Sequence, residues 1–282
     1  MKFSILINTH NQRNYLLRCI NSCLNQSYKG KYEIIICDTS SESNEDIIKK
    51  IKKKNLFYYH KKKFSKFPVI DQLFKIYYAF KKSKGQFILL LDGDDFFDRN
   101  KLDFASKVIN QEEMVFHDLP IYYFEKTRLK KNSRVIFYKK LLFYKRFINN
   151  WPIVYGTSCL FFNREILKNF FSLKKIFNFN YLAIDIMIAI FSQKLYKYNI
   201  IHKRITYKSI QDYNLDNKYN YIFSKIFWLR RKQQLDYEKY LGPRNINANY
   251  ILTNLIFFLL INLSCIKKLF YFFKKKKIIK TL

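Results

Sequence analysis

The chain has 282 residues, which is enough for one α/β domain with a substantial core and an appended piece. Its formal net charge is +32 at pH 7, but lysine far outnumbers arginine, as AT-rich codons favour, and no segment resembles a module that reads a nucleic-acid groove. We therefore expect no nucleic-acid partner, and anionic small molecules and acidic membrane surfaces instead. Five cysteines without a Cys-x-x-Cys pair indicate a reducing compartment, and no signal peptide precedes the first predicted strand, so we expect a cytoplasmic location.

Short apolar runs alternate with helical segments in the first third of the chain. Strands are predicted at residues 3–9, 33–37 and 87–91, and a helix with one apolar face follows the first of them. Strands this apolar indicate an α/β fold with a mostly parallel sheet that flanking helices cover on both faces. Such sheets bind ligands beyond the carboxyl ends of their strands, so we expect the acids that end these strands to converge on one crevice.

The third predicted strand stops at three carboxylates, Asp92, Asp94 and Asp95. Crowded carboxylates at the end of a buried strand repel one another unless a cation neutralises them. Mg²⁺ and Mn²⁺ prefer oxygen ligands and are usually held by one or two carboxylates together with substrate phosphates. The motif therefore predicts a site for Mn²⁺ or Mg²⁺ and a diphosphate at Asp92, Asp94 and Asp95, with a solvated acidic turn as the alternative.

An ordered series of segments resembles one known family. The chain is similar to the family 2 glycosyltransferases of GT-A fold, which are inverting, metal-dependent enzymes that use nucleotide-diphosphate sugars, over roughly the first 210 residues. The resemblance implies a Rossmann-like central sheet and a nucleotide-sugar donor. The segments that carry it are Thr9-His10-Asn11, Tyr15-Leu16, Leu24 to Tyr28, Glu33 to Asp38, Ser83 to Gln86 and Leu91 to Asp95.

The resemblance also implies roles for single residues. Asp38 lies where the family reads the base, and its carboxylate can accept the ring N–H of uracil, which favours a UDP-sugar; a strand-end cap is the alternative. Asp94 is the expected principal metal ligand, Asp92 a second ligand or a ribose contact, and Asp95 a ligand or a residue that orients the site. The family's usual glycine after the second strand is Ser40 here. The residues expected around the donor are Thr9, Asn11, Tyr15, Asp38, Asp71, Gln72, Asp92, Gly93 and Lys208.

Asp185 is the candidate catalytic base. Inversion needs a carboxylate that takes the proton from the attacking hydroxyl, and the family carries it on a helix, often as a Glu-Asp pair. Asp185 is the lone acid of the apolar segment 181–189, where burial can adjust its pKa, while Ile184 replaces the usual preceding acid. A role at a helix start or at the edge of the core is the alternative.

The C-terminal part departs from the sheet pattern, so we divide the chain into a GT-A domain at 1–214 and a helical region at 215–282. Residues 250–266 are apolar but short for a membrane-spanning helix, and an aromatic and lysine-rich segment follows them. This pattern predicts a helix that lies in the interface of an anionic membrane, with a helix packed on the catalytic domain as the alternative.

Two functions from different classes are compatible with these patterns. The first is a metal-dependent inverting glycosyltransferase that transfers a sugar from a UDP-sugar to a glycan or glycolipid acceptor in lipopolysaccharide or capsule synthesis, peripheral at the inner face of the cell membrane. The second is a catalytically degenerate GT-A protein that binds a nucleotide or a lipid. Ile184 favours the second, and the intact acids Asp38, Asp92, Asp94 and Asp95 favour the first.

Overall fold

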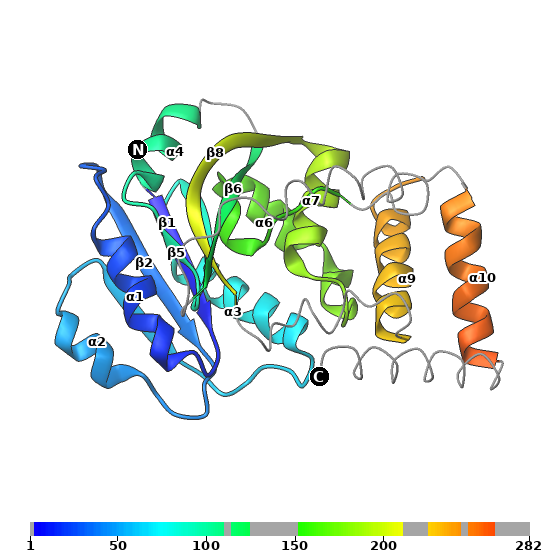
Figure 1. Ribbon diagram of the computed structural model, residues 1–282, viewed down its shortest axis with the longest axis horizontal. Helices are drawn as coiled ribbons and strands as arrows, with labels where there is room; N and C mark the ends of the chain where they lie inside the picture. Colours follow the sequence, from blue (N-terminus) through cyan, green and yellow to red (C-terminus); the bar gives the residue numbers. More distant parts are fainter. Residues whose placement is uncertain (1–2, 110–113, 125–151, 211–224, 244–247, 263–282) are drawn as a thin grey trace. The chain divides into compact units, whose positions relative to one another are not determined.

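The computed structural model describes residues 3–109, 114–124, 152–210, 225–243 and 248–262 (Figure 1). Its described part contains an eight-stranded sheet with the strand order β3-β2-β1-β4-β7-β6-β8-β5. The strands are β1 (Phe3–Thr9), β2 (Tyr32–Asp38), β3 (Leu56–His60), β4 (Phe87–Asp92), β5 (Phe96–Phe97), β6 (Met114–Phe124), β7 (Leu160–Asn163) and β8 (Lys197–Ile210). The helices are α1 (Arg13–Leu24), α2 (Glu45–Ile51), α3 (Pro68–Lys82), α4 (Lys101–Val108), η1 (Thr157–Cys159), α6 (Arg164–Ser172), η2 (Lys174–Asn178), α7 (Ile184–Leu195), α9 (Lys225–Tyr240) and α10 (Ala248–Asn262).

The four strands β3, β2, β1 and β4 run parallel. Thr9 on β1 pairs with Asp38 on β2, and Asn8 pairs with Asp92 on β4. Because the carboxyl ends of parallel strands meet at one edge of a sheet, Asp38 and Asp92 lie at the same edge. The predicted α/β architecture and the predicted convergence of these two strand ends are confirmed.

The other half of the sheet is mixed. β7 runs antiparallel to both β4 and β6, while β8 runs parallel to β6 and antiparallel to β5. Figure 1 shows β8 as a long, strongly curved strand, and its pairing with β6 is irregular at Asp118 and Leu119. This curvature matters for the site, since the end of β8 pairs with β5 directly after the acids of β4.

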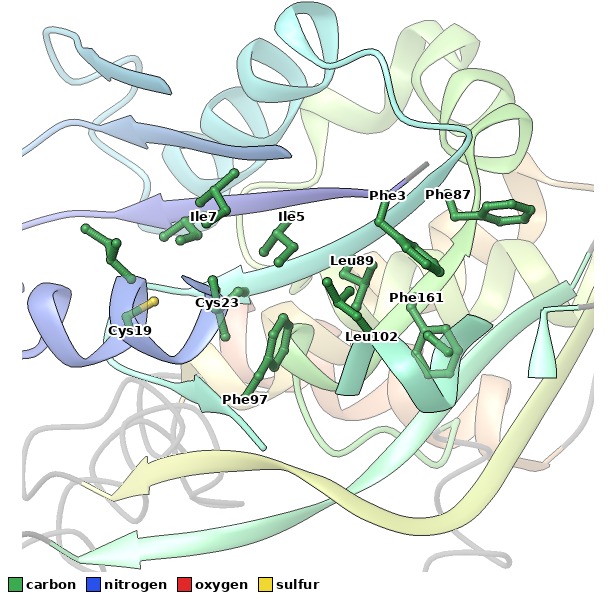
Figure 2. Close-up of a cluster of buried hydrophobic side chains, with 14 of the residues drawn as sticks. Phe3, Ile5, Ile7, Cys19, Cys23, Phe87, Leu89, Phe97, Leu102 and Phe161 are labelled. Atoms are coloured by element: carbon green, nitrogen blue, oxygen red, sulfur yellow. The ribbon is translucent and has the colours of Figure 1, made fainter. Parts of the chain in front are cut away.

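The core on one face of the sheet is built from alternate residues of β1, β2 and β4, which pack against α1 and α4. In Figure 2 the side chains of Ile5, Ile7 and Leu89 point toward Cys19 and Cys23 of α1, and α3 lies on the other side of the strands. Alternation explains the two-sided core, because neighbouring strand residues point to opposite faces. The predicted role of the cysteines as small core residues holds for Cys19, Cys23, Cys37 and Cys159, all of which are buried free thiols.

Two further helices belong to a second compact unit. α9 and α10 pack against each other, and Arg231 Nε lies 3.4 Å from Thr253 Oγ1, to which it donates. A helical C-terminal region was expected, and both described elements are helices. The proposed domain boundary at residue 214 and the basic segment after 262 lie outside the described residues. In the ranges that the structure describes, we find no helix with the length and apolarity needed to cross a bilayer.

Candidate active site

The turn after β4 carries the three acids and is held tightly. The N–H of Gly93 donates to the carbonyl of Asn8 (2.9 Å), and the N–H of Asp95 donates to the carbonyl of Asp92 (3.0 Å). A Cβ on Gly93 would lie 2.5 Å from Thr9 Oγ1 and 2.6 Å from Thr9 Cβ, closer than real Cβ atoms approach. The glycine is therefore needed for the close approach of the β4 turn to the end of β1.

Asp92 is positioned by side chains from two other elements. Its Oδ1 accepts hydrogen bonds from Asn8 Nδ2 and Gln72 Nε2, both at 2.8 Å. Its pKa is raised above the ordinary value, first because burial disfavours the charge and then because Asp94 is close. Gln72 thus lies at the acidic turn, and its predicted contact with the nucleotide stays a prediction.

Asp95 points into the protein and ties the acidic turn to the second half of the sheet. Its Oδ2 accepts from Ser158 Oγ (2.6 Å) and its Oδ1 accepts from the N–H of Ser209 (2.8 Å). Burial, followed by the charges of Asp94 and Asp92, raises its pKa well above the usual range. With both oxygens engaged by protein donors, the geometry of Asp95 favours the orienting role over direct metal ligation.

Asp94 is bracketed by two cationic side chains. Its backbone carbonyl accepts from Arg18 Nη2 (3.3 Å) and from Ser209 Oγ (2.5 Å). Burial raises the pKa of its carboxyl, and Lys208 and Arg18 oppose that rise. Lys208 also opposes the rise in the pKa values of Asp92 and Asp95. It lies between Tyr207, which pairs with Phe96, and Ser209, whose N–H donates to Asp95. β8 therefore brings Lys208 to the acidic turn, while its predicted contact with the donor stays a prediction.

A glycine makes room for that lysine. Gly156 has a φ of 129°, a conformation that favours glycine, and a Cβ there would lie 2.8 Å from Lys208 Nζ. Lys208 Nζ donates to the carbonyl of Tyr155 (3.4 Å). The segment 155–156 thus holds the amine beside the carboxylates.

A divalent ion would fit this site through two of the acids. Within the described ranges, no group of three or more His, Cys, Asp and Glu side chains is arranged to hold a metal ion. Asp92 and Asp94 nevertheless supply hard oxygen donors. Burial raises the pKa of both carboxyls, and a bound cation would offset the unfavourable burial of their negative charges. This donor set matches Mg²⁺ or Mn²⁺, which complete their coordination with water and substrate phosphates.

Asp38 is fully buried and engaged within its own loop. Its Oδ1 accepts from the N–H (2.7 Å) and the Oγ (2.5 Å) of Ser40, and its Oδ2 accepts from Asn44 Nδ2 and Tyr58 Oη, both at 2.7 Å. These four bonds match the full acceptor capacity of a carboxylate, so a base N–H could bind Asp38 only if one of them broke. They also explain why Ser40 can replace the family's glycine, because its backbone and side chain close the turn onto Asp38.

The remaining donor-site candidates join the loops at this edge of the sheet. Asn11 has a φ of 54°, its N–H donates to Ser40 Oγ (2.7 Å), and its Oδ1 accepts from the N–H of Ser41 (3.0 Å). Thr9 Oγ1 donates to Gln12 Oε1 (3.2 Å). The guanidinium carbon of Arg18 lies over the ring of Tyr15, 5.6 Å from the ring centroid.

Asp71 is a structural residue of α3 in the described contacts. Its Oδ2 accepts from Thr39 Oγ1 (2.9 Å) and pairs with Lys75 Nζ (3.2 Å), while its Oδ1 accepts from the N–H of Phe64 (2.8 Å). The side chain is buried. The proposed nucleotide contact from Asp71 therefore stays a prediction, and Gln72 is the member of this pair that reaches the acidic turn.

Asp185 lies in the first turn of α7, which begins at Ile184. Its Oδ1 accepts from the N–H of Ile186 (2.8 Å), and the helix dipole stabilises a carboxylate at this end. Burial, followed by the charge of Asp185, raises the pKa of Tyr198. The Tyr198 ring in turn lies 6.2 Å from His117, whose Nε2 accepts from the N–H of Tyr155 (3.0 Å). The contacts among Tyr198, His117 and Tyr155 thus join β8 and β6 to the segment that holds Lys208.

Sequence reasoning missed a buried polar network behind the site. Lys101 Nζ pairs with Asp118 Oδ1 (2.7 Å), and Thr206 Oγ1 donates to Asp118 Oδ2 (2.8 Å); all three side chains are fully buried. Next to them, burial lowers the pKa of His117 to about 3, and its Nδ1 has no hydrogen-bond partner among the described residues. Ser158, Ser209 and Arg18 were missed as well, because single polar residues acquire such roles only through contacts with distant parts of the chain.

Solved structures share this arrangement of sheet and helices. Staphylococcus aureus TarS in complex with UDP-GlcNAc superposes with a TM-score of 0.58 at 17% identity, over 94% of this chain and 76% of that one. The mannosyltransferase PcManGT from Pyrobaculum calidifontis, in complex with GDP-Man and Mn²⁺, gives a TM-score of 0.59 at 12% identity, over 92% and 70% of the two chains. At these identities the likeness concerns the fold, and the fold is that of the GT-A glycosyltransferases.

The sequence places the chain within one family. Residues 4–171 match the family Glycosyl transferase family 2, and the chain belongs to it. An uncharacterized glycosyltransferase of Rickettsia bellii is 35% identical over 116 residues, which is 41% of this chain and 16% of the relative. The Escherichia coli enzyme WfaP, a UDP-Glc:alpha-D-GlcNAc-diphosphoundecaprenol beta-1,3-glucosyltransferase, is 34% identical over 44% of this chain and 47% of its own length. The match thus spans less than half the length of these curated relatives.

Proposed function

We propose that this protein is an inverting glycosyltransferase that moves a sugar from a nucleotide-diphosphate sugar to a hydroxyl group of a glycan or glycolipid. The observation that carries the proposal is that β4 ends in Asp92 and Asp94 at the carboxyl edge of the parallel strands, where β8 brings Lys208 to the same turn. Two carboxylates and an amine at one point suit a metal-bound diphosphate, since the acids bind the cation and the amine pairs with phosphate oxygens.

A UDP-sugar is the donor that the comparisons favour. TarS structures contain UDP and UDP-GlcNAc, and the name of WfaP specifies UDP-Glc, whereas PcManGT is in complex with GDP-Man. A uracil N–H needs an acceptor in the base pocket. Asp38 is that acceptor only if one of its loop donors, Ser40, Asn44 or Tyr58, moves when the nucleotide binds.

The proposed reaction is a single displacement. Asp185 takes the proton from the acceptor hydroxyl, the oxygen forms a bond to the anomeric carbon of the donor sugar, and the bond from that carbon to the diphosphate breaks with its electron pair on the diphosphate. Lys208 stays beside the departing diphosphate and Asp95 holds the acidic turn in place. A divalent ion bound by Asp92 and Asp94 would supply charge stabilisation for the leaving group.

The acceptor and the place of action follow from the relatives and from the tail. WfaP acts on a diphosphoundecaprenol-linked sugar, and TarS is named a poly(ribitol-phosphate) beta-N-acetylglucosaminyltransferase, so surface-glycan synthesis such as that of lipopolysaccharide or capsule is the favoured pathway class. Lipid-linked acceptors are presented at a membrane. The aromatic and lysine-rich sequence 267–277 suits peripheral binding at the inner face of the cell membrane.

A catalytically degenerate binding protein is the second candidate. The four hydrogen bonds that occupy Asp38 and the Ile184 that replaces an acid before Asp185 favour it. Such a protein would bind a nucleotide or a lipid without turnover.

The deciding experiment uses the purified full-length protein with a panel of UDP-, GDP- and dTDP-sugars. A thermal shift identifies the donor, and the hydrolysis or transfer of that donor with Mn²⁺, with Mg²⁺ and with chelator identifies catalysis. We expect a UDP-sugar to stabilise the fold and Mn²⁺ or Mg²⁺ to support turnover. Stabilisation without turnover, with any metal and a membrane-extracted acceptor, would establish the binding protein instead. No stabilisation by any nucleotide sugar would overturn the glycosyltransferase and the nucleotide-binding form of the second candidate.

A further inference from the structure

Six aromatic side chains from three separate segments form a continuous patch on the outer side of α3. The ring centroids of Phe74 and Phe177 are 4.5 Å apart, those of Tyr77 and Phe171 4.9 Å, and those of Phe64 and Phe74 5.7 Å. Phe64 is 38% exposed and the others are partly exposed. This aromatic patch consists of Phe64, Phe74, Tyr77, Tyr78, Phe171 and Phe177.

The segments that carry the patch are rich in lysine. Segments 56–82 and 166–183 together contain ten lysines and one acid, Asp71, which is buried against Lys75. Lys61 Nζ lies 5.1 Å and Lys82 Nζ 5.9 Å from the ring centroid of Tyr78. These two lysines therefore stand over Tyr78. The exposed Glu165, which directly precedes the second segment, pairs with Lys168, so the lysines outnumber the exposed acids around the patch.

The same helix connects the patch to the candidate active site. Gln72 of α3 donates to Asp92, while Phe74 and Tyr77, on the same helix, belong to the patch. Phe67, just before α3, packs against Tyr181 (5.8 Å), which precedes Asp185 by four residues. A surface that engages the patch would thus lie beside the groups that handle the donor and the acceptor.

We propose that the aromatic patch is a membrane-docking surface that inserts into the interface of an anionic lipid bilayer. Partly exposed phenylalanine and tyrosine rings enter the head-group region, and the lysines around them meet anionic head groups, which is the combination that interfacial binding requires. Phe74 and Phe177 stack on each other with an interplanar angle of 24°, so one face of each ring is already covered by the other ring. Four of the six rings are phenylalanines, and none of these four supplies a hydrogen bond to sugar hydroxyls.

This docking surface is separate from the C-terminal segment that also suits a membrane. With the proposed function, membrane docking by the patch places the lipid end of the acceptor beside α3. Only this placement of the acceptor rests on the proposed function. Bilayer binding by the patch needs neither donor nor turnover, so the two can fail independently.

The test introduces a tryptophan into the patch of the full-length protein and measures whether brominated lipid quenches its emission. Phe64→Trp and Phe177→Trp keep an aromatic ring at each position, and Leu17→Trp, at a site on α1 that is 47% exposed, is the matched control on the opposite face of the sheet. Each variant is mixed with vesicles of phosphatidylcholine, with or without phosphatidylglycerol, that carry brominated acyl chains. The unsubstituted protein gives the contribution of its two native tryptophans.

We expect the emission of both patch tryptophans to be quenched by vesicles that contain phosphatidylglycerol, while Leu17→Trp stays unquenched. Co-sedimentation of a Phe64→Ser/Phe177→Ser double variant should fall relative to Leu17→Ser. Vesicle binding without quenching at either patch position would overturn the proposal, as would quenching of all three tryptophans alike. A patch tryptophan that responds to soluble polyphosphate but not to vesicles would assign the surface to a polyanionic polymer and overturn the lipid assignment. The thermal shift with UDP-sugars, measured on the same variants, reports separately on the donor site.

Discussion

Asp94 is the residue at which the metal hypothesis can be tested with little damage to the fold. Its turn is held through the backbone carbonyl, which accepts from Arg18 and Ser209 and is retained in any substitution. Asp95 and Asp38, by contrast, hold neighbouring loops through their carboxylates, so changing them would confound binding with folding. The hydrogen-bond partners of these three aspartates thus separate Asp94, a candidate metal ligand, from Asp95 and Asp38, which hold the surrounding loops.

The first prediction concerns Asp94→Asn. The amide keeps the shape of the side chain but removes the charge, so UDP binding supported by Mn²⁺ should be lost while the thermal midpoint of unfolding without ligand stays near that of the wild type. Isothermal calorimetry with UDP, with and without Mn²⁺, measures it. Asp103→Asn on the exposed side of α4 is the matched control. Equal affinities in the Asp94 variant and the wild type would remove Asp94 from the metal site.

The second prediction concerns Asp185→Asn. Loss of a general base typically lowers the rate by ~10² to 10⁴-fold, whereas donor binding should be nearly unchanged. Glu165→Gln, an exposed acid in the first turn of α6, controls for the loss of a helix-start charge. Turnover within a few-fold of the wild type would assign the proton transfer to another group.

The third prediction uses the buried imidazole of His117, whose pKa is lowered to about 3 from the ordinary 6.5. Between these two pH values the unfolded chain binds a proton that the folded chain does not, so stability is fully present above pH 6.5 and falls as pH drops toward 3, by about 1.4 kcal/mol per pH unit. His117→Gln keeps an acceptor for the N–H of Tyr155 and removes this proton. Denaturant unfolding at a series of pH values should give a shallower acid limb for the variant; parallel curves would contradict the assignment.

At the scale of secondary-structure elements, the site depends on one turn that four elements hold. α1 supplies Arg18, η1 supplies Ser158, β8 supplies Ser209, and β1 contacts Gly93 through Thr9. The hydroxyl of Ser158 joins Asp92 to Asp95, since its Oγ accepts from the N–H of Asp92 and donates to the carboxylate of Asp95. A change in any one element would therefore move all three acids together.

The fourth prediction follows from this packing. Gly93→Ala brings a methyl group into Thr9, and relief requires the β4 turn to move away from the end of β1. Overpacking of this kind typically lowers the free energy of unfolding by about 1–3 kcal/mol. Urea denaturation measures the loss, and UDP affinity should fall with it because Asp92 and Asp94 are displaced. An unchanged denaturation midpoint would show that the turn yields without strain.

At the scale of the whole molecule, three of the four parallel strands could be predicted from sequence, whereas β3 and the mixed half of the sheet could not. Residues 33–37 and 87–91 are apolar runs that end in acids, and the observed strands differ from the prediction only at their ends. β8 is a partly exposed strand of 14 residues whose pairing with β6 and β5 depends on contacts far along the chain, which local patterns do not record. For the same reason, the hydrogen bond from the N–H of Ser209 to Asp95 could not be predicted, because the two residues are 114 positions apart in the sequence.

Membrane binding by the C-terminal segment is the last prediction. α10 packs on α9 and exposes Ile251, Leu255 and Phe258, so deleting it would alter the fold of this unit, and changing charge is the cleaner experiment. Lys274 to Lys277 follow it in sequence, and each lysine near anionic lipid adds ~1 kcal/mol, a contribution that salt screens. Changing these four lysines to Gln should therefore weaken binding to phosphatidylglycerol vesicles by roughly 10²-fold or more at low salt and much less at high salt. Binding to neutral vesicles should scarcely change.

The matched control changes four other exposed lysines to Gln, on and directly after α2: Lys49, Lys50, Lys53 and Lys54. Co-sedimentation at two salt concentrations measures both sets, and equal losses in the two would show that net charge, rather than this segment, attracts the protein to the membrane.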